Sequence, residues 1–348
     1  MASTQNISEK LDKKLQEYHD TNGISHSLLV VHNNKLLYNG SEGHHKMDNK
    51  IKTNDRSMYR MASVSKQFTA AAIYKLILQK KLKASQSIKE FFPDFASVGN
   101  DIRIQYLLSH SSGIYDYEEL MSDTITQQLS DYDILKMVEG INTTYFTPGS
   151  QFKYSNTAYC LLALIVEKVA GMSLQDYCKK NIFDPLDMKN TVWYGGQINN
   201  RVYGYAFDKS NQIVFNDQSL TSASLGDGGL YTSLSDYLKW YQGRKKIVGL
   251  DFSQMEQLAS KSITKDYLYS FGWFYKKQGK EIEILLHSGA TCGFSNIVVE
   301  IPETNTFIAY FTNLADYHNS FVSIETILKQ ANILPHDFSY TEMHQQTH

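Results

Sequence analysis

Apolar residues recur with two different periods along the chain, and each period predicts a different kind of element. From Ile7 to Tyr18 they fall at helical spacing among charged residues, which predicts an amphipathic helix. Two short apolar runs follow at 27–32 and 35–38, separated by an Asn-Asn pair that tolerates positive φ angles. We predict a β-hairpin over these two runs.

Helical patterns dominate the middle of the chain. Residues 61–77 are apolar on most faces, which predicts a long buried helix with Ser63 in its first turn. Residues 84–224 contain further helical stretches, notably 161–169 and 173–180, separated by glycine and proline. We find no convincing pair of strands in 84–224 and predict a mostly helical insertion there.

Strand patterns return in the last third of the chain. The predicted strands are 271–275, 282–286, 294–301 and 306–312. Apolar positions between 321 and 328 then predict a closing helix. The predicted fold class is therefore α/β of the α+β type, an antiparallel sheet flanked by helices with an inserted all-helical region. We expect a sheet domain formed by 1–83 and 225–348, a helical domain formed by 84–224, and an active site in the cleft between them.

Composition and charge limit the possible functions. The 348 residues are 42% hydrophobic and carry a formal net charge of -2, which gives no reason to expect binding to nucleic acid or an anionic membrane. A small-molecule or peptide substrate is the expected partner. Cys160, Cys178 and Cys292 have no C-x-x-C spacing, so we expect free thiols, no metal site and no cofactor.

Targeting signals give little information. The first residues lack a basic segment followed by an apolar one, and the longest strongly apolar run, 161–166, is far shorter than the ~20 residues that span a bilayer. We therefore expect no membrane span. The location stays open: periplasmic or secreted if a signal peptide was removed, and otherwise cytoplasmic. Nothing in the sequence indicates an oligomeric state.

The first candidate for chemistry is the pair Ser63 and Lys66. On a helix, three residues apart, a hydroxyl and an amine lie on the same face, where the amine can activate the hydroxyl as a nucleophile. The same spacing also begins at Ser150 and at Ser262, so the motif alone is weak. Only Ser63 opens a long apolar helix.

The second candidate is Tyr154-Ser155-Asn156, which precedes a helix predicted to begin near Tyr159. An extended backbone would project Tyr154 and Asn156 the same way. The phenol could share proton transfer with Lys66, and the carboxamide could hold a substrate carbonyl. The alternative is a helix start at which Ser155 or Asn156 is only the cap.

The third candidate is His287-Ser288-Gly289, at the end of a predicted strand. There a polar side chain could point into a cleft, and the glycine would let a ligand approach the backbone. A single histidine at the end of a strand is, however, more often structural than catalytic.

Taken together, the three motifs in this order resemble the penicillin-recognising serine hydrolases, and in particular the group of class C β-lactamases, D,D-peptidases and esterases. Five further segments look like parts of that family, at 107–113, 148–156, 182–188, 226–229 and 271–273. The resemblance covers roughly residues 25–330 and implies a β-lactamase/transpeptidase-like fold. His110, in the first segment, looks like a structural corner of that fold.

The resemblance also implies roles for the motif residues. Ser63 would be acylated, with Lys66 and Tyr154 sharing the general acid and base work. Asn156 would orient the substrate and Lys66. The oxyanion hole would be formed by the backbone N–H groups of Ser63 and Ala290, and water would release the product.

The strand motif departs from the family pattern. His287, with Ser288 and Gly289, stands where the family usually has Lys-Thr-Gly, and is expected to face the cleft and bind substrate there. A histidine is mostly neutral near pH 7, so recognition of a substrate carboxylate is in doubt. We therefore expect a serine hydrolase of peptide, amide or ester bonds, such as a D,D-carboxypeptidase, D-aminopeptidase or esterase, rather than an efficient β-lactamase. The alternative is a non-catalytic sensor or scaffold that binds peptides or cell-wall fragments.

Overall fold

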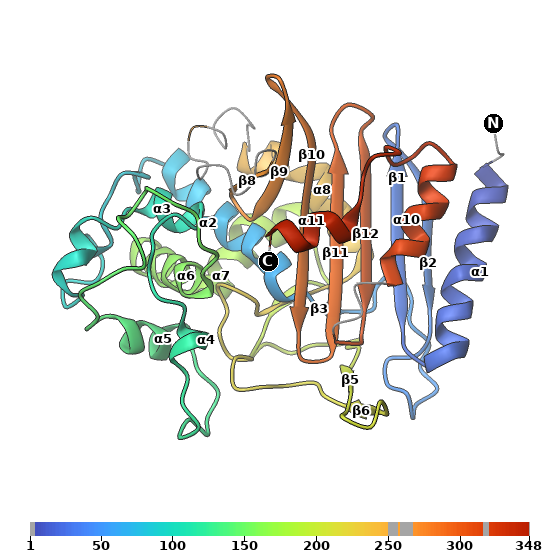
Figure 1. The fold of residues 1–348 in the computed structure, drawn as a ribbon, viewed down its shortest axis with the longest axis horizontal. Coiled ribbons are helices and arrows are strands. Elements are labelled where there is room, and N and C mark those ends of the chain that lie inside the picture. The colour runs from blue at the N-terminus through green and yellow to red at the C-terminus, as the bar shows by residue number, and fades with distance from the viewer. Residues whose placement is uncertain (1–3, 250–256, 258–266, 316–319, 348) are drawn as a thin grey trace.

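A computed structural model of the chain describes residues 4–249, 257, 267–315 and 320–347. Its main feature is a seven-stranded antiparallel sheet in the order β2-β1-β12-β11-β10-β9-β8, with a helical region beside it (Figure 1). Two smaller sheets have the orders β3-β7-β4 and β5-β6.

The strands fall into three groups along the chain. Those of the large sheet are β1 (His26–His32), β2 (Lys35–Glu42), β8 (Tyr267–Ser270), β9 (Trp273–Gln278), β10 (Glu281–Thr291), β11 (Phe294–Ile301) and β12 (Thr306–Thr312). The short ones are β3 (Tyr59–Arg60), β4 (Val192–Trp193), β5 (Tyr205–Phe207), β6 (Ile213–Phe215) and β7 (Leu230–Thr232).

The helices lie on both faces of the large sheet and in the region beside it. They are α1 (Thr4–Asn22), α2 (Lys66–Leu78), α3 (Ile104–Leu108), α4 (Tyr117–Leu120), α5 (Asp131–Val138), α6 (Asn156–Ala170), α7 (Leu174–Cys178), α8 (Leu234–Val248), α10 (Ser320–Gln330) and α11 (Tyr340–Thr347). Short 3-10 or π turns are η1 (Ala62–Ser65), η2 (Ile88–Glu90), η3 (Ser97–Asn100), η4 (Lys179–Phe183) and η5 (Asp184–Leu186).

The predicted sheet and its flanking helices are confirmed. Asn33 and Asn34 adopt φ angles of 51° and 61°, which form the tight turn between β1 and β2. Every residue of β11 and β12 is buried, because α10 and α11 cover one face of the sheet and α8 the other (Figure 1). This double cover explains why these strands read as continuous apolar runs rather than alternating ones.

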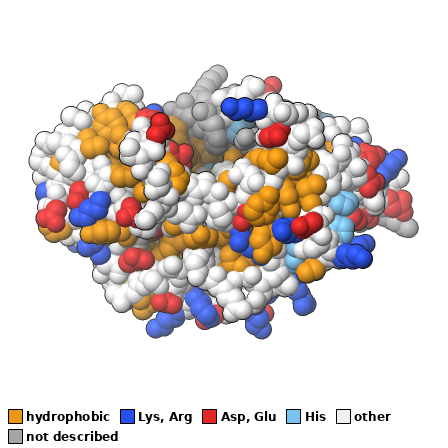
Figure 2. Space-filling view, turned by 90° about the horizontal axis from the view of Figure 1, so that it is seen from below, with side chains coloured by type: hydrophobic (Ala, Val, Ile, Leu, Met, Phe, Trp, Pro, Cys, Tyr) orange, Lys and Arg blue, Asp and Glu red, His pale blue; other side chains and the backbone are white. Residues whose placement is uncertain are grey.

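The middle of the chain differs from the prediction in one respect. It contains strands as well as helices: β5 and β6 form a hairpin, and β4 pairs with β7. These strands are only two or three residues long, too short to give a periodic signal. The hairpin exposes Phe207, Val214 and Phe215. Figure 2, which views the molecule from below, shows hydrophobic side chains gathered among charged ones.

Helix α2 joins the sheet to the helical region. Its Phe68 ring lies 4.6 Å from Trp240 of α8 and 5.9 Å from Phe183, and one hydrophobic cluster runs through both parts of the chain. The division into two domains stays a prediction. Among the described helices, none alone is long and apolar enough to cross a membrane. Residues Asn156–Ala170 and Leu174–Leu186 reach that length and composition only as a pair bent by 74°.

Candidate active site

Ser63 lies in the 3-10 turn η1, directly before α2, rather than in the α-helix itself. The preceding residue, Ala62, has a φ of 49°, a conformation that costs free energy for a residue with a Cβ. This sharp entry turns Ser63 toward a pocket that Ala62 also lines.

Lys66 is the centre of the hydrogen-bond network around the nucleophile. Its side chain is 0% exposed, and Nζ donates to Ser63 Oγ (3.0 Å), Asn156 Oδ1 (2.7 Å) and the main-chain oxygen of Asp227 (2.9 Å). Burial lowers the pKa of Lys66, but Tyr154 and Asp227 raise it, and the pKa lies above its ordinary value. All three ammonium protons therefore have acceptors in the resting site.

Asn156 is held by the start of α6. Ser155 is the N-cap and accepts a hydrogen bond from the N–H of Ala158 at 3.2 Å, so the capping alternative is correct for Ser155. Asn156 is the first helical residue, its N–H donates to Asp116, and its Nδ2 donates to Glu118 Oε1 at 3.1 Å. Its carboxamide thereby connects Lys66 to a carboxylate that the sequence analysis did not identify.

Tyr154 is positioned by His110. The two rings lie 4.1 Å apart, and His110 Nδ1 accepts a hydrogen bond from the N–H of Ser155 at 3.1 Å. His110 itself has a φ of 53°, and its carbonyl oxygen accepts from the N–H of Lys153. His110, the predicted structural corner, therefore fixes the conformation of the loop that carries Tyr154, a predicted proton-transfer residue.

The Tyr154 hydroxyl group interacts electrostatically with both Ser63 and Lys66. Lys66 Nζ also lies 5.0 Å from the centre of the Tyr154 ring. Burial raises the pKa of Tyr154 above its ordinary value, although Lys66 and Ser63 lower it. The resting pair is therefore a phenol beside an ammonium group.

His287 was predicted to face the cleft, but it lies buried among aromatic side chains. Its side chain is 0% exposed, and Nε2 is hydrogen-bonded to Tyr269 Oη at 3.2 Å. The ring lies beside Tyr154, with centres 6.3 Å apart, and beside Phe274 at 5.2 Å. Alternation along β10 gives the side to which a residue points, but not the aromatic side chains that cover it.

The next three residues of β10 have three different environments. Ser288 is buried and is a hydrogen-bond partner of Tyr340 in α11, which is not the contact expected of a substrate-binding residue. Gly289 packs against the main chain of Met61. Ala290 is exposed and lines the same pocket as Ser63, as an oxyanion hole formed by their two N–H groups requires.

The pocket beside Ser63 is small and polar, with an empty volume of about 320 Å³. Asn156, Thr221, Ser224, Asp227, Gly228 and Thr291 contribute to its walls. Its charged groups include Glu118, whose side chain is accessible from the pocket although protein surrounds most of its carboxyl group. This desolvation, with the charges of Asp227 and Asp116, raises the pKa of Glu118 to about 7.

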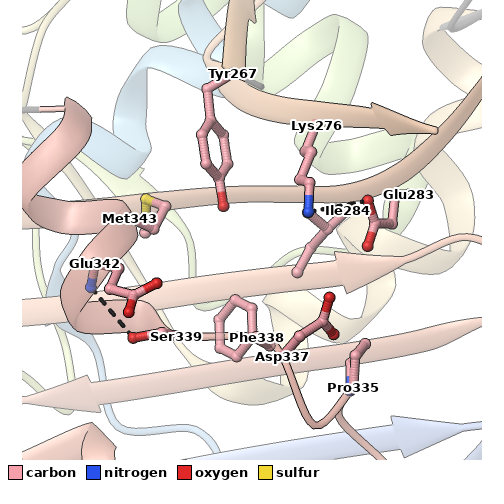
Figure 3. A pocket seen from close by; sticks show the side chains of 10 residues that line it. All are labelled: Tyr267, Lys276, Glu283, Ile284, Pro335, Asp337, Phe338, Ser339, Glu342 and Met343. Atoms are coloured by element: carbon pink, nitrogen blue, oxygen red, sulfur yellow. Dashed lines mark hydrogen bonds and ion pairs between the residues drawn. The ribbon is translucent and has the colours of Figure 1, made fainter. Parts of the chain in front are cut away.

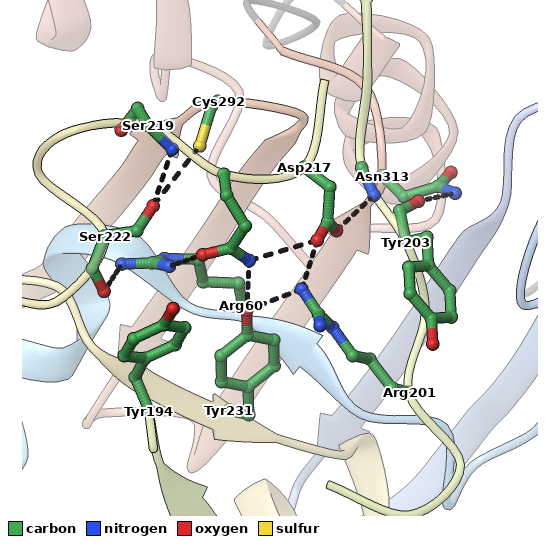
Figure 4. Close-up of polar contacts among 12 residues, drawn as sticks. Arg60, Tyr194, Arg201, Tyr203, Asp217, Ser219, Ser222, Tyr231, Cys292 and Asn313 are labelled. Atoms are coloured by element: carbon green, nitrogen blue, oxygen red, sulfur yellow. Dashed lines mark hydrogen bonds and ion pairs between the residues drawn. The ribbon is translucent and has the colours of Figure 1, made fainter. Parts of the chain in front are cut away.

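Arg60, at the end of β3, also lines the pocket, and Figure 4 shows its polar contacts. It is 2% exposed and donates from Nη2 to the main-chain oxygen of Ser222 at 2.9 Å. Its guanidinium group also lies 5.5 Å from the ring of Tyr194 and 5.9 Å from that of Tyr231. Arg60 therefore holds the segment around Ser222 in place, and Glu118 presents the more accessible charge.

A larger hollow of about 580 Å³ lies elsewhere, between β8–β10 and the segment leading into α11 (Figure 3). Its Lys276 is paired with Glu283 at 3.4 Å, and Tyr267 and Phe338 are among the residues that line it. None of the predicted catalytic residues lines this hollow.

The Ser150–Lys153 pair takes no part in the hydrogen bonds around Ser63 that the structure describes. Lys153, the partner of Ser150 by spacing, is instead paired with Glu119 at 3.0 Å. Ser262 lies outside the described residues. All three cysteines are free: Cys160 and Cys178 are buried, and Cys292 is partly exposed.

Comparisons with known proteins agree on one family. A family model described as Beta-lactamase matches residues 11–332. Penicillin-binding protein 4* of Bacillus subtilis is 29% identical over 329 residues, which cover 88% of this chain and 71% of that protein. Protein flp of Staphylococcus aureus (strain MW2) is 27% identical, with 90% of this chain but only 63% of flp covered, so this chain spans less than two thirds of flp.

Among solved structures, D-amino acid amidase from Ochrobactrum anthropi SV3, in complex with L-phenylalanine amide, matches with a TM-score of 0.76. The match covers 94% of this chain and 99% of the amidase. At 19% identity it bears on the fold alone.

Proposed function

Because this chain belongs to the β-lactamase family and has its antiparallel sheet-and-helix fold, we propose that it is a serine hydrolase that cleaves amide or ester bonds through an acyl-enzyme on Ser63. The observation that carries the proposal is the 3.0 Å contact between Lys66 Nζ and Ser63 Oγ. A purely structural role does not account for this contact, because a buried lysine beside a serine that follows the strained residue Ala62 is costly to maintain.

Tyr154 takes the proton in the proposed acylation step. Lys66 donates all three of its protons and cannot accept another, so its positive charge stabilises the phenolate of Tyr154. When the pair has lost one proton, the phenolate removes the proton of Ser63 and Oγ bonds to the substrate carbonyl carbon. Tyr154 then returns the proton to the leaving group as the carbon–nitrogen or carbon–oxygen bond breaks.

The N–H groups of Ser63 and Ala290 are proposed to stabilise the oxyanion that forms on the carbonyl oxygen. Asn156 holds Lys66 and can donate from Nδ2 to a substrate carbonyl. In the second half of the reaction a water molecule gives its proton to Tyr154 and its oxygen to the acyl carbon. Tyr154 passes that proton to Ser63 Oγ as the bond between Oγ and the acyl carbon breaks, which releases the acid product and leaves Tyr154 as the phenolate again.

Glu118 supports a narrower substrate class. A carboxylate in the pocket, joined to Asn156 at 3.1 Å, is complementary to a protonated amine near the scissile carbonyl. It would repel a substrate carboxylate in the same place. We therefore favour amino-acid amides, esters or short peptides with a free amino group over β-lactams, and the solved amidase with a similar fold acts on substrates of this kind by its name.

The alternative function is a non-catalytic sensor or scaffold that binds peptides or cell-wall fragments. The hydrogen bond from Lys66 to Ser63, with Tyr154 beside both residues, argues against it, since binding alone needs no such arrangement. The two functions differ in one respect that can be measured: only the hydrolase forms a covalent serine adduct.

Intact mass spectrometry after incubation with a fluorophosphonate, and separately with a penicillin, tests the proposal. We expect the fluorophosphonate to add its mass to the wild type and not to Ser63→Ala. Ser150→Ala is the matched control and should label like the wild type. Labelling that survives in Ser63→Ala refutes the site, and a wild type that reacts with neither this probe nor a small ester supports the binding alternative.

The substrate class is tested by comparing the amide of an amino acid with its N-acetylated form. We expect kcat/KM to favour the free amine, and Glu118→Gln to remove most of that preference. Faster hydrolysis of the acetylated form, or of a penicillin, would contradict the assigned role of Glu118.

A further inference from the structure

Two buried carboxyl groups, Asp131 and Asp227, lie near Lys66 and have no part in the proposed bond-making steps. Their residues are 7% and 5% exposed. Asp131 is the first residue of α5, and Asp227 lies in the segment before β7. One oxygen of each carboxyl and the Sγ of Cys160 in α6 all lie within 4.8 Å of one another.

Asp131 fixes the segment that holds Lys66. Its carboxyl oxygens accept hydrogen bonds from the N–H groups of Leu225 and Gly226, the shortest at 3.2 Å. The next residue, Asp227, presents its main-chain oxygen to Lys66. The position of the Lys66 ammonium group therefore depends on a contact made by α5.

The Asp227 carboxyl is incompletely satisfied by the described part of the chain. Its Oδ2 accepts from Tyr117 Oη at 3.1 Å, whereas its Oδ1 is buried and has no hydrogen-bond partner among the described residues. A buried carboxylate oxygen without a donor is costly. The Asp131 carboxyl, with an oxygen within 4.8 Å of an Asp227 oxygen, is the neighbouring acid that can retain a proton.

We infer that Asp131 and Asp227 share one proton and act as positioning residues for Lys66, to which the pair presents a single negative charge. The inference rests on the proposed function, because the charge matters through Lys66 and Tyr154. Two carboxylates this close in a buried site cannot both ionise easily, and a shared proton removes the repulsion.

The electrostatics of the surrounding elements agree with a shared proton. The groups that interact with Asp227 are Lys66 on α2, Asp116, Tyr117 and Glu118 at α4, Asp131 on α5, Tyr154 before α6, and Cys160 on α6. Lys66 is the cation of this group. Burial, and then the charge of Asp227, raise the pKa of Asp131 to about 8, so Asp131 is protonated at neutral pH.

A proton fits this position better than a metal ion. Asp131 already accepts two backbone hydrogen bonds, and the Asp227 residue binds the Lys66 ammonium group through its main-chain oxygen. A divalent cation would add positive charge beside that ammonium group. Burial also raises the pKa of the Cys160 thiol, which opposes formation of the thiolate that a metal would need.

The charge of the pair controls how readily Lys66 and Tyr154 lose the proton that the reaction requires. With Asp227 neutralised, the proton leaves at lower pH. With Asp131 ionised as well, the pair carries two charges and the proton leaves at higher pH. The two substitutions Asp227→Asn and Asp131→Asn should therefore differ in their effect on the pH profile.

The test is the pH dependence of kcat/KM together with a ¹³C NMR titration of protein labelled at the aspartate carboxyls. We expect Asp227→Asn to shift the acid limb to lower pH by about one unit or more, the size of shift caused by a close charge. Asp131→Asn should keep the acid limb of the wild type and remove any inflection near pH 8. In the wild type one aspartate signal should titrate near pH 8, and it should be absent in Asp131→Asn.

Asp236→Asn is the matched control. Asp236 is also buried, but it lies in α8, where its carboxyl group accepts a hydrogen bond from the N–H of Asn190. It should leave the pH profile in place whatever its effect on stability. A shift in Asp227→Asn no larger than in this control overturns the inference. The inference is also overturned if no aspartate of the wild type titrates near pH 8, a measurement that needs neither a folded variant nor hydrolysis. A stoichiometric metal ion in the purified protein that is lost in Cys160→Ser would overturn it as well.

Discussion

Gly289 of β10 lies against the main-chain carbonyl of Met61, so closely that a Cβ at position 289 would come within 2.2 Å of that oxygen. Met61 is two residues before Ser63, and its carbonyl accepts a hydrogen bond from Val64 in the 3-10 turn η1. The strand that carries Ala290 and the turn that carries Ser63 are therefore held at one separation, which sets the distance between the two proposed oxyanion donors.

Gly289→Ala should move the two proposed oxyanion donors apart. Because the obstacle is backbone rather than a flexible side chain, the strand or the turn must shift, and we expect kcat/KM to fall by about 100-fold or more, the cost of a misplaced oxyanion donor. Gly140→Ala is the control, since no atom lies within 4 Å of its added Cβ, and it should be close to neutral in both activity and melting temperature. Full activity of Gly289→Ala on a small ester would show that this contact does not determine the separation of the two proposed oxyanion donors.

Tyr154→Phe tests the proposed proton transfer. The ring remains and keeps its contacts with His110 and Lys66, so the fold should be preserved while the proton-transfer group is lost. We expect kcat/KM to fall by about 10² to 10⁴, the usual contribution of a general acid or base. Tyr38→Phe removes a buried hydroxyl bonded to Asp12, far from Ser63, and should leave activity unchanged. Equal effects of the two substitutions would assign Tyr154 a structural role.

The sequence predicted the sheet, the long helix α2 and the network of Ser63, Lys66, Tyr154 and Asn156, because periodicity and motif order carry that information. It did not predict the environment of His287, which depends on aromatic rings such as Tyr269 that come from other strands. Glu118 lay in no motif that we used. Strand alternation and helical spacing describe neighbours along the chain, whereas these positions depend on packing between distant segments.

Asp227 could have been noticed from the sequence, since it lies in the Gly226-Asp-Gly-Gly229 segment that resembles the family. Its partner Asp131 is near the start of a helix, where an aspartate has an ordinary explanation as a favourable charge at the N-terminus. Only the structure brings the two carboxyls together.

Glu118 should make substrate binding depend on pH near neutrality. Its pKa is raised to about 7, so the carboxylate that binds an ammonium group is lost as the pH falls below 7, while a substrate α-amino group loses its charge above about 8. KM for an amino-acid amide should therefore be lowest between about pH 7 and 8 and rise on both sides. Glu118→Gln should abolish the rise of KM on the acid side. The KM of an N-acetylated substrate should show no such dependence on pH.

The neighbouring Glu119→Gln is the control for that measurement. Glu119 is exposed and is paired with Lys153, outside the pocket, so this variant should keep the pH dependence of the wild type. An unchanged KM profile in Glu118→Gln would remove the argument for a free amino group in the substrate.

Asp131 should also make the stability of the protein fall as pH rises. Its folded pKa, about 8, lies above the value of 3.8 expected in the unfolded chain, so its contribution to stability is fully present below about pH 4 and is lost as pH rises to about 8. Asp131→Asn removes this loss, and its urea midpoint relative to the wild type should improve steadily from pH 4 to pH 8.

Asp133→Asn in the same helix should behave in the opposite way. Hydrogen bonds from Ser130 lower the pKa of Asp133, so its contribution is present above about pH 4 and lost in acid. Urea midpoints for Asp131→Asn that run parallel to those of the wild type across this range would mean that Asp131 is ionised in the folded protein, and the shared proton would be refuted with it.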